Sequence, residues 1–125
     1  VEFNMLGAEF AGDRMRAEGF ATWFESYAAE KAYFGKGNSF AKSILQAAEA
    51  SYKQQPGVFQ FRGTADDYAR ASAYFSAIVD RRGIRGLMDV YGAMRSKHCD
   101  FFEGVKISLG WKRAKLDEEV LRLFR

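Results

Sequence analysis

The chain has little of what marks a disulfide-rich, loop-rich or membrane-spanning protein. Its 125 residues include one cysteine, one proline and one histidine. A single cysteine, Cys99, excludes an internal disulfide framework, and one proline is fewer than loop-rich or disordered chains carry. No apolar run approaches the roughly twenty residues that a membrane-spanning helix needs. The composition therefore predicts one globular domain without a membrane span.

A strong charge of one sign is also missing. Sixteen acidic residues offset nineteen basic ones and leave a formal net charge of +3. Two basic stretches, residues 95–98 and 112–115, are typical of solvated faces, because acids are interspersed and no nucleic-acid-binding motif accompanies them. Nucleic acid is therefore not an expected partner. Binding to an anionic surface stays a minor alternative, recognisable by strong salt dependence.

Aromatic and aliphatic side chains are plentiful, and they recur at helical spacing. The chain is 48% hydrophobic and 16% aromatic, with twelve phenylalanines, which suffices for one sizeable core but not for two. We expect an all-α bundle of about six to seven helices, forming a single domain over residues 1–125. The predicted helical segments are residues 1–11, about 16–35, 39–54, 64–83, a segment that starts at about 84, 101–110, and a last segment that starts at about 115.

Capping residues support several of these boundaries. Thr64 offers an N-cap hydroxyl, and the carboxylates of Asp66 and Asp67 complement the positive end of the helix dipole. These two acids are not expected to act as an acid and base pair, since adjacent helical residues do not face each other. Asp100 is the expected cap of the short helix that Gly110 closes.

Residues 16–24 read Arg-Ala-Glu-Gly-Phe-Ala-Thr-Trp-Phe, with a glutamate opening a strongly aromatic helix. This segment resembles the one that carries the third zinc ligand of gluzincin metallopeptidases, and the resemblance implies that Glu18 is that ligand. In the family, two histidines of a helical His-Glu-x-x-His motif complete the protein ligands, and water takes the fourth position. The resemblance implies zinc as the cofactor of the parent family and a peptide or protein as the substrate.

The histidine motif itself is not in this sequence, whose only histidine is His98. Family members commonly separate the second histidine from the glutamate by about eighteen residues, and seventeen residues precede Glu18. We therefore expect the motif to end just before Val1, and this chain alone to bind no zinc and hydrolyse no peptide. A rival register puts a degenerate motif on residues 1–5, but it supplies no imidazole and leaves too short a gap.

Residues 64–75 carry a second likeness to gluzincins, because Tyr68 opens a helix rich in small residues. In aminopeptidase-like members, a tyrosine in the similar segment donates a hydrogen bond to the oxyanion of the tetrahedral intermediate, a role suited to a neutral phenol. Residues 78–83 continue this likeness, and residues 83–88, 101–105 and 109–111, followed by a final helix, look like the helical tail of such peptidases. In a departure from the family, Thr22 stands where many members have an acid that orients a zinc histidine.

Each of these residues also has a simpler interpretation. The helix dipole alone favours Glu18 in a first turn, and Tyr68 suits the edge of a core. His98 and Cys99 project in different directions on a helix, which favours a loop or cap role over a metal site. The aromatic stripe over residues 20–27 is typical of a core face, though it could line a groove.

The competing hypothesis is a non-catalytic helical module that binds a protein, with a homo-oligomer as one possibility. The two hypotheses differ in geometry. A peptidase ancestry predicts that Glu18 and Tyr68 face one cleft, whereas an interaction module predicts that they lie far apart.

Overall fold

The computed structural model describes residue 6 and residues 13–32, 38–57 and 59–125, and all regular structure in these residues is helical. The all-α class is therefore confirmed. The expected six to seven helices are slightly too many, because the described part of the chain has five and residues 65–97 count as one of them. The candidate helix over residues 1–11 lies, apart from Leu6, outside the described residues. The helices are α2 (Arg14–Ala32), α3 (Asn38–Gln54), α4 (Ala65–Lys97), α5 (Phe101–Leu109) and α6 (Arg113–Leu123).

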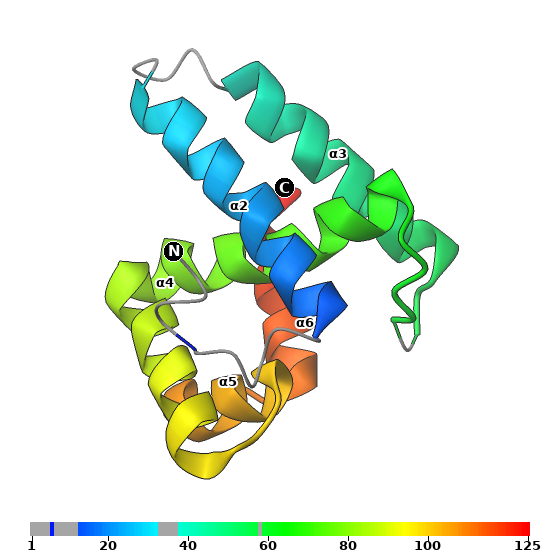
Figure 1. Ribbon diagram of the computed structural model, residues 1–125. Helices are drawn as coiled ribbons and strands as arrows, with labels where there is room; N and C mark the ends of the chain where they lie inside the picture. Colours follow the sequence, from blue (N-terminus) through cyan, green and yellow to red (C-terminus); the bar gives the residue numbers. More distant parts are fainter. Residues whose placement is uncertain (1–5, 7–12, 33–37, 58) are drawn as a thin grey trace.

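The long helix α4 changes direction at Gly83. This residue has φ 71° and ψ −178°, a backbone conformation that is essentially restricted to glycine. In Figure 1 the first part of α4 crosses behind α2, and the second part turns down toward α5. The sequence predicted one helix ending at Gly83 and another beginning at Ile84, so the kink lies at the predicted residue even though no loop separates the two parts.

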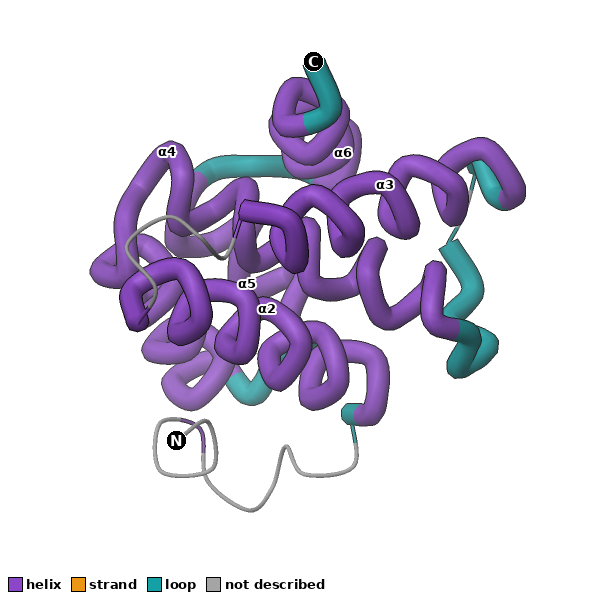
Figure 2. Tube along the Cα trace, turned by 90° about the horizontal axis from the view of Figure 1, so that it is seen from above, coloured by secondary structure: helices purple, strands orange, loops and turns teal. Residues whose placement is uncertain are grey.

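Each of the other four described helices packs on α4. Figure 2 shows α2 and α3 side by side, with α6 on the far side of α3. At the centre, Phe75 of α4 lies edge-on to Phe20 of α2, with ring centroids 5.9 Å apart, and contacts Phe101 of α5 at 4.8 Å. Phe20 and Trp23 are buried, as the aromatic stripe predicted, whereas Phe24 is 39% exposed.

Side-chain caps define the starts of three described helices. The Asp67 amide donates to Thr64 Oγ1 at 3.1 Å, and the Glu103 amide donates to Asp100 Oδ1 at 2.8 Å, so both predicted caps are confirmed. Asp13 caps α2 in the same way, which explains why this helix begins two residues earlier than expected. None of the helices described is both long and apolar enough to cross a lipid bilayer.

Candidate functional site

Helix α2 crosses the first part of α4 where Gly19 lies against Ala71. A β-carbon at position 19 would come within 2.9 Å of the backbone carbonyl carbon and of Cβ of Ala71, so a larger residue would push the helices apart. Glu18 directly precedes Gly19 on α2, and Tyr68 lies one turn before Ala71 on α4. The two residues singled out in the sequence therefore flank the same helix crossing.

The carboxylate of Glu18 has no polar partner within the described part of the protein. It is half-buried, and no hydrogen bond or ion pair joins its carboxylate to another described residue. Both carboxylate oxygens of Glu18 are therefore available as acceptors toward a ligand.

Tyr68 is held by contacts with Arg14 and Phe61. Arg14 Nη2 donates a hydrogen bond to Tyr68 Oη at 3.1 Å. The rings of Tyr68 and Phe61 stack at 5.4 Å with an interplanar angle of 5°, and the Arg14 guanidinium lies 5.5 Å from the Phe61 centroid. Because the phenol oxygen accepts from Arg14, its own proton remains for another acceptor. Sequence reasoning missed Arg14, although it lies one turn before Glu18 on the same face of the helix.

The described residues do not form a metal site by themselves. No group of three or more histidine, cysteine and acidic side chains among them lies close enough to hold an ion. His98 is the C-cap of α4, with φ 51°, and the Cys99 thiol donates to the Ala93 carbonyl at 3.8 Å. Burial, with the nearby carboxylates of Asp100 and Glu103, raises the pKa of Cys99, which disfavours the thiolate that a metal would need.

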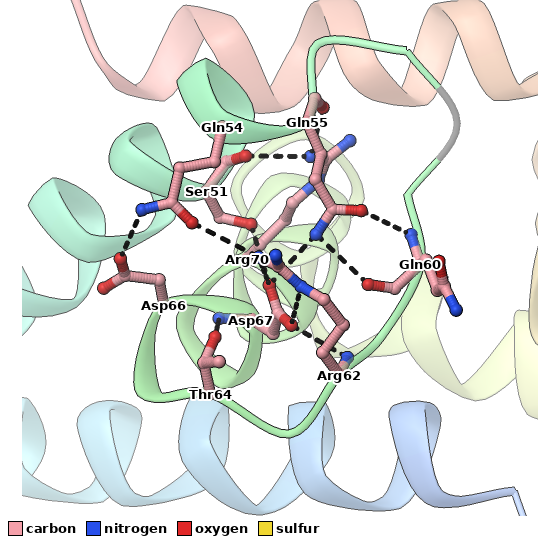
Figure 3. Close-up of polar contacts among 9 residues, drawn as sticks. All are labelled: Ser51, Gln54, Gln55, Gln60, Arg62, Thr64, Asp66, Asp67 and Arg70. Carbon is pink, nitrogen blue, oxygen red and sulfur yellow. Dashed lines mark hydrogen bonds and ion pairs between the residues drawn. The ribbon is translucent and has the colours of Figure 1, made fainter.

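A polar network ties the end of α3 to the start of α4 (Figure 3). Its centre is Asp67, which is fully buried. One carboxylate oxygen accepts from the Arg62 amide at 2.8 Å and from Arg62 Nε at 3.3 Å, and the other accepts from Ser51 Oγ at 3.2 Å. Burial opposes ionisation, but these donors and the Arg62 charge outweigh it and lower the pKa of Asp67. Besides complementing the helix dipole, Asp67 thus anchors the loop before α4.

Arg70 is a buried cation in the same region. Its guanidinium lies 3.8 Å from the Tyr52 ring centroid and 4.4 Å from that of Phe59. Nη1 donates to the backbone carbonyls of Gln55 at 2.7 Å and Ser51 at 3.3 Å. Carbonyls at a helix C-terminus lack partners within the helix and carry partial negative charge, so Arg70 caps the end of α3. The sequence analysis did not single out this residue.

An open groove of about 570 Å³ lies between the ends of α3 and α6. In its wall, Tyr52 donates a hydrogen bond to Asp117 at 2.7 Å and packs edge-on against Phe124. Burial, reinforced by Tyr74 and Asp117, raises the pKa of Tyr52, so its hydroxyl is a structural donor. The lining residues are Glu49, Tyr52, Lys53, Pro56, Leu121, Phe124 and Arg125.

Comparison of this chain with protein-family models, with curated proteins and with solved structures found no significant match. The resemblance to gluzincins therefore depends only on the residues of this sequence.

Proposed function

We propose that this chain is the C-terminal helical part of a gluzincin-like zinc peptidase, with Glu18 as a metal ligand and Tyr68 as the donor to the oxyanion. The observation that carries the proposal is the contact of Gly19 with Ala71. Glu18 and Tyr68 are far apart in the sequence, and both flank this one helix crossing. An interaction module without catalytic ancestry has no need for that arrangement.

The contacts of Tyr68 suit a donor role. The hydrogen bond that it accepts from Arg14 polarises the phenol and strengthens it as a donor. Stacking on Phe61 limits the movement of the ring, and a donor that is already positioned stabilises developing negative charge without reorganisation.

Glu18 cannot hold a catalytic zinc alone, because such an ion requires three protein ligands. The described residues do not form a group of three or more such ligands, so no catalytic step is assigned to this chain alone. Under the proposal, the remaining ligands are the two histidines of the His-Glu-x-x-His motif that the resemblance implies.

The test joins a helical His-Glu-x-x-His segment to the N-terminal side of this chain. We expect the extended protein to bind one zinc per polypeptide by mass spectrometry. Glu18→Ala should lose the zinc. Tyr68→Phe should keep the zinc but lower kcat for peptide hydrolysis about 10²- to 10³-fold, the effect of removing one oxyanion donor.

Glu25→Ala is the matched control, since Glu25 is an exposed glutamate on the same helix. It should change neither zinc content nor kcat. An extended protein that binds no zinc, or one whose zinc content survives Glu18→Ala, would contradict the proposal.

A second candidate function is protein binding through the groove between α3 and α6, including self-association. It is favoured by the 43% exposure of Leu121, whose side chain lines this apolar groove. Light scattering of the wild type and of Leu121→Ser tests the homo-oligomer. Self-association that Leu121→Ser abolishes supports it, and a monomeric wild type at high concentration argues against it.

A further inference from the structure

We propose that Arg14 binds the α-carboxylate of a peptide's C-terminal residue, so that the site takes peptides with a free carboxyl end. The inference deepens the proposed function and rests on Tyr68 being the donor to the substrate carbonyl. The guanidinium of Arg14 donates a hydrogen bond to Tyr68, but no carboxylate among the described residues neutralises its charge.

The guanidinium of Arg14 is positioned by three neighbours. Nη2 donates to Tyr68 Oη at 3.1 Å, and the charged carbon lies 5.5 Å from the Phe61 ring centroid. On another side lies the backbone of Gly63, where an added β-carbon would come within 3.2 Å of Nη2. A guanidinium held in this way loses less conformational freedom on binding a ligand than a freely moving one.

The charge of Arg14 is not paired within the described part of the chain. No carboxylate there lies within ion-pair distance of it, including Glu18 one turn along the helix. The residue is exposed, and only one of its five N–H groups donates to a described residue. The remaining donors present the planar fork that matches a carboxylate with two parallel hydrogen bonds.

The position of Arg14 relative to Tyr68 selects which carboxylate fits. The side chains of Arg14 and Tyr68 are in direct contact. A carboxylate bound to Arg14 and a carbonyl bound to Tyr68 are therefore separated by about the length of one residue, since consecutive Cα atoms lie about 3.8 Å apart. In a peptide chain, the last peptide bond has that separation between its carbonyl and the terminal carboxylate. The geometry therefore points to the C-terminal residue as the group recognised.

Binding is tested on the 125-residue chain itself, without zinc or hydrolysis. The probes are N-acetyl-Ala-Phe as the free acid and as the C-terminal amide, titrated while the NMR signals of Arg14 Nε–Hε and the Tyr68 ring are followed. We expect the acid to shift both signals and to bind at least tenfold more tightly than the amide. Arg14→Lys should weaken binding of the acid, because an ammonium cannot offer the planar fork, and Arg14→Ala should abolish the preference.

Arg95→Ala removes another exposed arginine, near the far end of α4, and should leave the preference unchanged. Equal binding of acid and amide, or no shift by either up to about 10 mM, would overturn the inference. Equally tight binding of an amidated peptide with an internal aspartate would overturn the assignment to the α-carboxylate. A failure of the extended protein to bind zinc would instead count against the proposed peptidase and leave this binding result standing.

Discussion

Gly19 of α2 and Ala71 of α4 approach each other so closely that a side chain at position 19 has no room. The hypothetical β-carbon lies 2.9 Å from both the backbone carbonyl carbon and Cβ of Ala71. Backbone atoms cannot swing aside as the end of a long side chain can. This contact therefore sets the spacing of α2 and α4, and with it the positions of Glu18 and Tyr68.

Gly19→Ala should lower the free energy of unfolding by about 1–3 kcal/mol, the usual cost of overpacking a tight contact. Urea denaturation followed by circular dichroism measures the change. Gly92→Ala is the control, since a β-carbon there meets nothing within 4 Å. It should raise stability by about 0.5–1 kcal/mol, as expected for alanine in place of glycine inside a helix. Equal stabilisation of both variants would contradict the close packing of Gly19 against Ala71.

Gly83→Ala should destabilise the protein for a different reason. Open space surrounds this position, but its φ of 71° and ψ of −178° place any other residue in a strained conformation that costs about 1–3 kcal/mol. Thermal unfolding of the variant should show a lower Tm. Here too Gly92→Ala shifts the Tm in the opposite direction, and an unchanged Tm for Gly83→Ala would mean that α4 does not kink at this residue.

Asp67→Asn should lower the free energy of unfolding by about 1.5–3 kcal/mol at neutral pH, because a buried charged acceptor is lost from the network with Arg62 and Ser51. Asp66→Asn is the matched control. The side chain of Asp66 accepts only an exposed hydrogen bond from Gln54, so its replacement should change stability by less than about 0.5 kcal/mol.

The pH dependence of stability gives a second measure of Asp67. The folded protein holds the pKa of this carboxyl below its ordinary value of 3.8. The ionised form therefore contributes stability that is fully present above about pH 5 and is lost as pH falls through the folded-state pKa. Urea titrations between pH 7 and pH 3 should show a steeper loss for the wild type than for Asp67→Asn. Some loss should persist in the variant, because neighbouring cations overcome burial and lower the pKa of Glu119 as well.

Arg70→Ala should lower the free energy of unfolding by about 3 kcal/mol. It removes charge-assisted hydrogen bonds to the end of α3 and a cation stacked on two rings. Arg70→Lys keeps the charge but not the planar guanidinium, and we expect it to lose less than the alanine variant. Chemical denaturation of both variants tests the order. Equal stability of the lysine variant and the wild type would show that stacking on Tyr52 and Phe59 contributes nothing.

Much of the secondary structure was predictable because its causes are local. The hydroxyl of Thr64 and the carboxylate of Asp100 cap helices at the expected residues, since a cap acts on amides two or three positions away. Gly83 was expected to end a helix, and it is where α4 bends. Whether the chain continues as a separate helix or as the same one after a bend depends on what packs around it, which is why the helix count was slightly wrong.

The polar contacts of the candidate site were not predictable in this way. Nothing in the sequence pairs Arg14 with Tyr68, or Asp67 with Ser51, because each contact joins residues on different helices. Arg70 reads as an ordinary charged residue, and its burial depends on α3 ending beside it.

The sequence by itself thus determined the helical class, most helix boundaries and the residues Glu18 and Tyr68 as candidates, because periodicity, caps and motifs operate within a few residues. Only the tertiary structure decided that these two candidates flank one crossing and that the exposed Arg14 donates a hydrogen bond to Tyr68. The physical reason is that α2 can pack this closely on α4 only because Gly19 has no side chain. That effect depends on which residue of α4 lies opposite Gly19, and the sequence does not give this.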